Sequence, residues 1–300
     1  MMKYSLIIKT VFSMLIGGLA VPALGQITMN TALPVTEGNT IIRMQTKFIR
    51  STGDPSSMNR DLIVQAVPLV AVHGITERLA VFGVVPYLNK RLQVNTPLGR
   101  KTRKVQGLAD ARFFARYTLW QWNAIGETRR IAPFTGVEAP TGQDDATDGL
   151  GRLPQPLQLG SGSWDYFGGL VFTWQTLHWQ IDVAPSYQYN SPANNFRFGQ
   201  VVRLDAQGKY RVLPRRLGNG VPGFFYANLE TNLIWQGKNQ IDGTPDPNSG
   251  GATWYLVPGI QYVTVRAVLE AAIRLPVVQR LHGSALKNDF ITTLSMRINI

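Results

Sequence analysis

The stretch VRLDAQGKYRV at residues 202–212 decides the fold class, because small or apolar residues alternate with charged or amide residues along all of it. One face carries Val202, Leu204, Ala206, Gly208, Tyr210 and Val212, and the other carries Arg203, Asp205, Gln207, Lys209 and Arg211. A period of two is typical of a β-strand. Strands of soluble proteins average about 5 to 6 residues, whereas tilted membrane-spanning strands need about 9 to 11. The stretch therefore favours a membrane-spanning strand.

Long alternating segments recur along the chain, bounded by clusters of Gly, Pro, Asn or Asp. The twelve segments are residues 42–48, 62–73, 79–88, 108–120, 130–139, 164–174, 178–189, 198–213, 225–236, 253–262, 266–277 and 289–300. Nearly all of them are long enough to span a bilayer, and no convincing amphipathic helix interrupts them. An even number of strands places both ends of the chain on the periplasmic side.

The connections between these segments alternate in length. The longer ones are residues 51–61, 89–107, 140–163, 190–197, 237–252 and 278–288, and the shorter ones include 74–78, 121–129, 175–177 and 263–265, with 214–223 as the exception. Outer-membrane barrels have short periplasmic turns and longer external loops. We therefore predict an all-β fold, a single closed antiparallel transmembrane β-barrel of about twelve strands over residues 39–300.

The tryptophans agree with this prediction, because membrane barrels place aromatic girdles at both interfaces. Five of the seven lie on the apolar face close to a strand end: Trp164, Trp174, Trp179, Trp235 and Trp254. Trp120 and Trp122 instead share the face of Arg112 and Arg116. Either a bulge turns them outward or they line the periplasmic mouth.

The N-terminus has the pattern of a cleaved signal peptide over residues 1–25. Lys3 and Lys9 come before and beside an apolar run at 11–24 that ends in small residues. A membrane anchor helix is disfavoured, because the run is short and contains two glycines and a proline. We expect export to the outer membrane of a Gram-negative bacterium, where lipid and the barrel assembly machinery are partners.

The composition excludes several other classes. The 300 residues include no cysteine, which rules out disulfides, cysteine-bound metals and a lipoprotein anchor. A mean hydropathy of -0.04 is too low for a helical membrane bundle and too high for intrinsic disorder. The net charge of +12 could suggest nucleic acid, but the basic residues alternate with lipid-facing ones and form no patch. No nucleotide motif or cofactor site is present, since the glycine-rich stretch 160–169 lacks a strand-to-helix context.

Five stretches resemble one known family in the same order along the chain. They are Gly107-Leu-Ala-Asp110 leading into Ala115-Arg116-Tyr117, Val137-Glu-Ala-Pro-Thr-Gly142, Gly160-Ser-Gly-Ser-Trp-Asp165, Leu256-Val-Pro-Gly-Ile-Gln-Tyr262, and Leu269-Glu-Ala-Ala-Ile-Arg-Leu-Pro-Val277. These resemble the family named for the meta-pathway of phenol degradation. The resemblance implies an outer-membrane barrel and an uptake role, for aromatic compounds as the family name suggests, and it supplies no catalytic residues. One departure is the C-terminal Ile300, where such barrels usually end in an aromatic residue.

The polar face of the predicted strands points into the barrel and supplies the candidate solute-lining residues. They are Arg43, Lys47, Asp110, Arg112, Arg116, Arg130, Glu138, Asp165, Asp182, Arg203, Glu230, Glu270 and Arg274. Across the whole predicted inner face, eleven basic residues stand against seven acidic ones. One interpretation is a mildly basic selectivity filter. The other is that opposite charges on neighbouring strands pair with one another.

The second and third strands differ from the rest because both of their faces are apolar. Ile63, Val67, Leu69 and Ala71 face one way on the second strand. We place Val81 and Val85 on the lumen side of the third. This apolar stripe could guide a hydrophobic or aromatic solute. Alternatively, it packs the N-terminal segment, residues 26–38, folded into the barrel as a plug.

Other chemistries find less support. Two acidic external loops, around residues 144–148 and 242–248, do not match a calcium-binding loop. Ser186 and His178 share a face but are eight residues apart, so no hydrolase site is predicted. A twelve-stranded barrel has a backbone radius of roughly 12 Å, too narrow for a wide porin once arginines project inward. The sequence thus predicts a non-enzymatic channel for small solutes. The alternatives are a non-conducting structural or interaction barrel and, with less support, an outer-membrane hydrolase.

Overall fold

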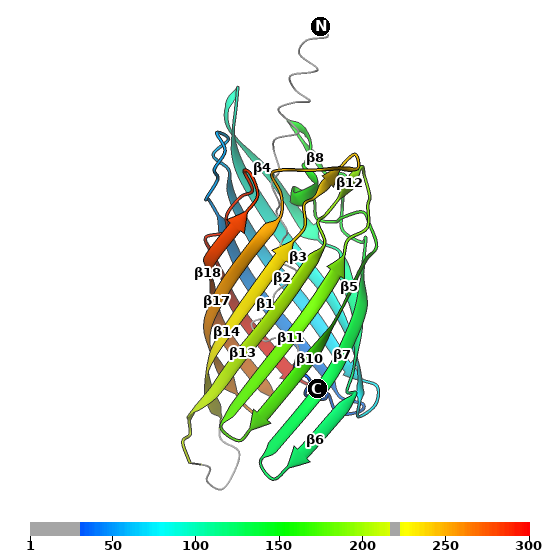
Figure 1. Ribbon diagram of the computed structural model, residues 1–300, viewed down its shortest axis with the longest axis vertical. Coiled ribbons are helices and arrows are strands. Elements are labelled where there is room, and N and C mark those ends of the chain that lie inside the picture. Colours follow the sequence, from blue (N-terminus) through cyan, green and yellow to red (C-terminus); the bar gives the residue numbers. More distant parts are fainter. Residues whose placement is uncertain (1–30, 217–222) are drawn as a thin grey trace.

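The computed structural model describes residues 31–216 and 223–300, so the predicted signal peptide lies outside the described residues. The described chain forms a tall barrel of long tilted strands (Figure 1). Its twelve wall strands are β1 (Thr40–Ser51), β2 (Asp61–Gly74), β3 (Leu79–Thr96), β5 (Ala111–Tyr117), β7 (Glu127–Ala139), β10 (Asp165–Thr176), β11 (Trp179–Tyr189), β13 (Val201–Leu213), β14 (Phe224–Gln236), β17 (Gly251–Val263), β18 (Ala267–Leu281) and β19 (Phe290–Asn299).

Each wall strand pairs antiparallel with its neighbours in the chain, and the first strand pairs with the last. Met44 of β1 lies opposite Leu69 of β2 on one side and Met296 of β19 on the other. This last pairing closes the barrel, so none of these strands has an exposed edge. The predicted fold is confirmed, and each of the twelve predicted segments coincides with one wall strand.

The structure differs from the prediction in the connections. The predicted external loop at 89–107 is largely a hairpin, because β3 continues to Thr96 and pairs with β4 (Gly99–Leu108). This hairpin rises above the wall beside the other long connections (Figure 1). The same end carries the short strands β8 (Thr147–Asp148), β9 (Gly151–Arg152), β12 (Phe196–Arg197), β15 (Gln240–Ile241) and β16 (Thr244–Pro245) and the 3-10 helix η1 (Gln155–Leu157).

The solvent exposure of the wall is the reverse of that of a soluble protein. On β1, the outward Met44 is 51% exposed, whereas the inward Gln45 and Lys47 are 3% and 2% exposed. On the wall strands from β10 onward, apolar side chains cover the outside and most inward side chains are polar, with Val171, Val257 and Val268 among the exceptions. A closed barrel with an apolar outer face is suited to a membrane, because all backbone polar groups are paired within the wall. In the described part of the chain, no helix is long and apolar enough to cross a membrane.

The register explains how Trp120 and Trp122 reach the outer face. They lie on β6 (Trp120–Ala124), which pairs only with the start of β7 at the lower end of the barrel (Figure 1). Arg116 lies opposite Phe134, and Trp120 opposite Ile131, so four residues of one strand match three of the other. The extra residue is a bulge that reverses the inward and outward positions. Of the two predicted alternatives, the outward rotation is therefore correct.

These tryptophans belong to an aromatic cluster at the lower rim of the wall. The Arg129 guanidinium lies 5.0 Å from the centre of the Trp122 ring and 4.7 Å from that of Trp174. Trp174 donates a hydrogen bond from Nε1 to Glu127, and its ring meets Trp179 edge to face at 4.3 Å. Rings with one polar end suit the boundary between lipid and water. The rim therefore marks where the membrane ends.

Because the outer face of the wall is apolar, a charged substitution on this face should destabilise the folded barrel. Leu294 lies near the middle of β19 and is 63% exposed on the outer face. We expect Leu294→Arg to destabilise the folded barrel in lipid vesicles by about 2 to 4 kcal/mol, the cost of a basic side chain at bilayer mid-depth. Urea unfolding in vesicles measures this. The control Leu98→Arg, at the exposed tip of the β3–β4 hairpin, changes stability little, and an equal loss in both variants would contradict the membrane position of the wall.

Candidate solute pathway through the barrel

The barrel interior contains two cavities, one above the other. The lower one, at the end where β1 begins, has a volume of about 540 Å³. The upper one, at the end of the long connections, has a volume of about 220 Å³. Four residues line both of them: Arg112, Gln188, Val201 and Arg203. These four side chains therefore lie where the two cavities meet.

One wall of the lower cavity is apolar. On β2 it consists of Pro68, Val70 and Val72, and on β3 of Phe82 and Val84. The prediction that Val81 and Val85 face the lumen is wrong, because both are exposed on the outer face. The error arose because both faces of these two strands are apolar, so alternation could not show which face points inward. The apolar stripe inside the barrel exists, but it is formed by the opposite set of residues.

The apolar wall continues as a cluster of four phenylalanines. Phe82 of β3 stacks on Phe114 of β5, with ring centres 4.2 Å apart. Phe114 also meets Phe134 of β7 and Phe167 of β10 edge to face, at 6.2 and 5.7 Å. Stacked and edge-to-face pairs are the favourable geometries of aromatic rings. These rings were not among the residues predicted from the sequence, although Phe114 alternates in phase with Arg112 and Arg116.

The facing wall carries charged and amide side chains. Arg43 of β1 forms an ion pair with Glu270 of β18 at 3.0 Å, and Gln261 donates to the same carboxylate. Arg274 and Glu230 approach within 3.9 Å on neighbouring parts of the wall. Lys47 is buried close to Arg43, Arg274 and Glu230. The charges of this wall thus mostly pair with one another, as the second interpretation of the sequence expects.

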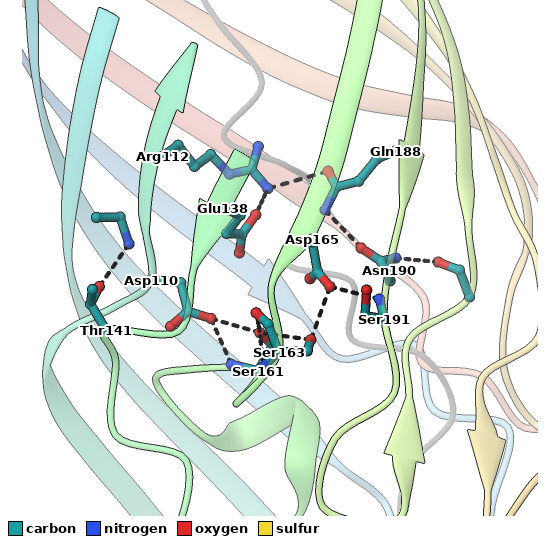
Figure 2. Close-up of polar contacts among 12 residues, drawn as sticks. Asp110, Arg112, Glu138, Thr141, Ser161, Ser163, Asp165, Gln188, Asn190 and Ser191 are labelled. Atoms are coloured by element: carbon teal, nitrogen blue, oxygen red, sulfur yellow. Dashed lines mark hydrogen bonds and ion pairs between the residues drawn. The ribbon is translucent and has the colours of Figure 1, made fainter. Parts of the chain in front are cut away.

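Two ion pairs stand at the junction of the two cavities. Arg112 of β5 pairs with Glu138 of the adjacent β7 and donates a hydrogen bond to Gln188. Arg203 pairs with Asp205 two residues along β13 at 3.1 Å. Figure 2 shows the first of these pairs, with Gln188 of β11 pointing toward it. The junction of the two cavities is therefore lined by arginines of two separate parts of the wall.

Asp110 and Asp165 anchor the external connection 140–164 to the wall (Figure 2). Asp110 accepts hydrogen bonds from the backbone of Gly142 at 2.9 Å and from both the backbone and the hydroxyl of Ser161. Asp165 accepts from the Ser163 hydroxyl at 2.9 Å and from the backbone of Ser191. Both carboxylates lie on the inner side of the wall. Their oxygens accept hydrogen bonds from the external connections and so hold these connections in place.

The anchored connection folds inward and covers the upper part of the apolar stripe. Leu157 of η1 packs with Leu62 and Val64 of β2, and Leu159 packs with Ala66 of the same strand. Lys90 of β3 donates to the carbonyl oxygens of residues 156 and 158. Residues 140–163 were predicted to form an external loop, and this inward packing could not be predicted because the apolar residues of the loop form no strand or helix pattern.

The N-terminal segment occupies the lower end of the barrel. Arg116 donates hydrogen bonds to the carbonyl oxygens of Thr31 and Leu33. The backbone of Ala32 donates to the Thr173 hydroxyl at 2.7 Å. Val35 packs against Val72 and Ala80 of the apolar stripe. Residues 31–35 thus lie inside the barrel, with the backbone bound to one part of the wall and an apolar side chain to another.

The wall provides room and support for this segment. A Cβ at Gly74 would come within 2.3 Å of the Thr36 carbonyl oxygen, so only glycine allows this close approach. Thr173, which holds Ala32, donates to Asp182 at 2.5 Å. Gln180 and Gln207 fix the other oxygen of Asp182 at 2.7 Å each. The predicted residue Asp182 therefore supports the wall side of the contact.

All thirteen predicted residues lie on the inner side of the wall. Arg130 of β7 does so opposite Thr173, and its guanidinium donates to Thr128. Their contact with a solute stays a prediction. Within the described ranges, no group of three or more metal-binding side chains could hold a metal ion.

A buried ion pair links two connections at the external mouth of the barrel. Arg60 pairs with Asp54 at 2.6 Å within the connection from β1 to β2, and it also donates to the carbonyl of Ser284 in the last external connection. Burial by itself raises the pKa of Asp54, but the hydrogen bonds from Arg60 and Ser56 outweigh burial and lower this pKa from 3.8 to about 2. Because the folded pKa is lowered, the stabilisation is present at neutral pH and is lost as the pH falls through about 2.

Comparison with known proteins identifies the family. The sequence profile of the family described as "Putative MetA-pathway of phenol degradation" matches residues 62–273. The chain belongs to this family. The resemblance found in the sequence is thereby confirmed over most of the barrel. None of the curated proteins matches the chain in sequence.

Solved structures show the same fold. The COG4313 outer membrane channel from Pseudomonas putida F1 has a TM-score of 0.70 at 16% identity, with 92% of this chain and 100% of that chain covered. The β domain of the Bordetella autotransporter BrkA has a TM-score of 0.43 at 12% identity, covering 87% and 99% of the two chains. The translocator domain of NalP from Neisseria meningitidis has a TM-score of 0.43 at 8% identity, covering 89% and 90%. The first similarity shows that this family member has the fold of an outer-membrane barrel.

The anchoring by Asp110 predicts the behaviour of the inward-folded connection. We expect Asp110→Asn to weaken its hold on Gly142 and Ser161, since hydrogen bonds to a charged group contribute about 1.5 to 3 kcal/mol. Hydrogen exchange of the backbone of residues 142–161 should accelerate by tenfold or more. Asp145→Asn, in the same connection but exposed, is the control and should leave the exchange unchanged. Equal exchange in the wild type and Asp110→Asn would show that the carboxylate is not the anchor.

The pairing of Asp54 predicts its titration. In detergent-solubilised protein, ¹³C NMR of the carboxyl group should give a pKa of about 2 for Asp54. Arg60→Gln should raise that pKa, because it removes the side-chain hydrogen bonds that favour the ionised form. Arg152→Gln, which removes an exposed arginine from a different external connection, should have no effect on Asp54. An unchanged pKa in Arg60→Gln would mean that other groups set the titration.

Proposed function

We propose that this protein is an outer-membrane channel through which small amphipathic solutes cross. The observation that carries the proposal is the pair of cavities that meet at Arg112 and Arg203 inside a closed wall. The signal peptide predicted at residues 1–25 delivers the chain to the periplasm, and the assembly machinery inserts it into the lipid of a Gram-negative outer membrane. Its aromatic rims and apolar outer face support this location.

The two walls of the lower cavity suggest the class of solute. A solute with an apolar face fits against the stripe of β2 and β3 and the phenylalanine cluster, while its polar groups face Arg43, Lys209 and their neighbours. The inner face carries more basic than acidic residues, which favours neutral or anionic solutes over cations. Aromatic or hydrophobic compounds with a polar group combine both requirements. The size of the cavities excludes large solutes.

The N-terminal segment acts as a plug in this proposal. Residues 31–35 cover part of the apolar stripe and lie within the lower cavity. Two hydrogen bonds of Arg116 and one of Ala32 are among the contacts that bind its backbone to the wall. The segment can leave the cavity without unfolding the barrel, because the wall strands begin only at Thr40.

Two other functions make different predictions. A non-conducting structural or interaction barrel would use its external connections, and the ion pairs and inward-folded loop that fill its lumen favour this alternative. A hydrolase would need a serine beside a base. Ser186 lies on the inner face of β11, and His178 lies in the turn before that strand, beside Arg211. Eight residues of strand separate them by about 26 Å, so they cannot act together, and esters and phospholipids should remain uncleaved.

Single-channel recording in planar bilayers tests the channel and its plug. We expect small, resolvable openings from the wild type and a higher conductance or open fraction after deletion of residues 26–35, because the deletion clears the lower cavity while sparing the turn at 36–39. Unchanged conductance would refute the plug. The absence of conductance from both proteins, at any voltage and salt concentration, would favour the non-conducting barrel.

A further inference from the structure

The inner face of β5 presents an aromatic ring between two guanidinium groups. Arg112, Phe114 and Arg116 follow one another at every second position, so all three point into the barrel. The guanidinium of Arg116 lies 5.2 Å from the centre of the Phe82 ring, and that of Arg112 lies 5.4 Å from that of Phe167. Since Phe82 and Phe167 both contact Phe114, the cations flank one continuous aromatic surface.

The two arginines differ in what they bind. Arg112 forms an ion pair with Glu138 on the neighbouring strand, so a carboxylate of the protein already balances its charge. Arg116 donates to the carbonyl oxygens of Thr31 and Leu33, which are neutral groups of the N-terminal segment. Arg116 is nevertheless buried, with only 5% of the residue exposed. A carboxylate adds the attraction of opposite charges and can accept two parallel hydrogen bonds from one guanidinium, which separate neutral carbonyl oxygens cannot reproduce.

We infer that Arg116, Phe82 and Phe114 form a binding site for a planar aromatic carboxylate, for which residues 31–33 compete. The carboxylate of the ligand takes the place of the two carbonyl oxygens on Arg116. Its ring lies against the phenylalanine cluster. The inference rests on the proposed channel function and extends it, because it names the solute class and makes the solute itself the group that displaces the plug.

The geometry favours this ligand class over others. A small inorganic anion would satisfy Arg116 but leave the phenylalanine surface uncovered. A neutral aromatic compound would cover the rings but would not replace the carbonyl oxygens on the guanidinium. Only a ligand with both parts gains both interactions, and an offset-stacked or edge-to-face ring is the favourable contact here. The lower cavity, of about 540 Å³, has room for a single-ring compound beside the wall.

The site can be tested by ¹⁹F NMR titration of the detergent-solubilised full barrel with three probes. These are 4-fluorobenzoate, which has the ring and the charge, 4-fluorobenzyl alcohol, which has only the ring, and trifluoroacetate, which has only the charge. We expect 4-fluorobenzoate to bind at least tenfold more tightly than either of the others. Deletion of residues 26–35 should tighten binding of 4-fluorobenzoate further, because the competing carbonyl oxygens are removed.

Substitutions separate the two parts of the site. Arg116→Gln should weaken the binding of 4-fluorobenzoate by tenfold or more, since its carboxylate loses its partner. The binding of 4-fluorobenzyl alcohol should not change. Phe114→Leu should weaken the binding of both aromatic probes, 4-fluorobenzoate and 4-fluorobenzyl alcohol. The matched control is Arg129→Gln, which removes an arginine that lies over aromatic rings on the outer face of the wall and should leave binding of 4-fluorobenzoate within about twofold. Thermal unfolding confirms that each variant is folded.

The outcomes distinguish the site from the channel. Binding of 4-fluorobenzoate that does not depend on Arg116, or equal binding of all three probes, would overturn the inference even if the barrel conducts. Binding that depends on Arg116 in a barrel that never conducts would support the site and refute the proposed channel.

Discussion

The structure depends on the pairing of β1 with β19. In a bilayer no water is available to bind the polar groups of an unpaired strand edge, so a sheet can lie there only if its first and last strands meet. Ten residue pairs, from Ile41 with Asn299 to Arg50 with Phe290, make this closure continuous. Once the wall is closed, each side chain must point either to lipid or to the lumen. The period of two along each strand then determines the polarity of both faces.

The closed wall also explains how the lumen is filled. Twelve strands enclose a space that large side chains narrow but do not fill. On β13, β14, β18, β19 and β1 the wall uses ion pairs and amides such as Arg43 with Glu270, which satisfy one another at low exposure. On β2 and β3 the inner residues are apolar and need an apolar partner. The 140–164 connection supplies it from above through Leu157 and Leu159, and the N-terminal segment supplies it from below through Val35.

The sequence predicted the strands well because alternation depends only on neighbouring residues. The twelve segments and the polar inner faces of strands such as β13 followed from this pattern. Where both faces are apolar, as at Val81 and Val84 of β3, the pattern carries no information about direction, and the prediction failed. The roles of Asp110 and Asp165 could not be predicted either, because all of their partners except Ser163 lie 26 to 51 residues away in loops without periodicity. The bulge before Trp120 was one of two open alternatives, and only the register with Ile131 decides between them.

The division of the lumen into a charged and an apolar side bears on how a solute could move. A lumen lined evenly with ion pairs would offer a solute only water and fixed charges, and an evenly apolar one would exclude water. Here both surfaces run along the lower cavity, and they meet at the junction where Arg112 and Arg203 stand on different parts of the wall. An amphipathic solute can keep its ring on one surface and its polar group on the other without losing either contact as it advances. The N-terminal segment also makes both kinds of contact, because it places Val35 on the apolar stripe and its carbonyl oxygens on Arg116. In the proposed function the segment therefore lies on the path of the solute.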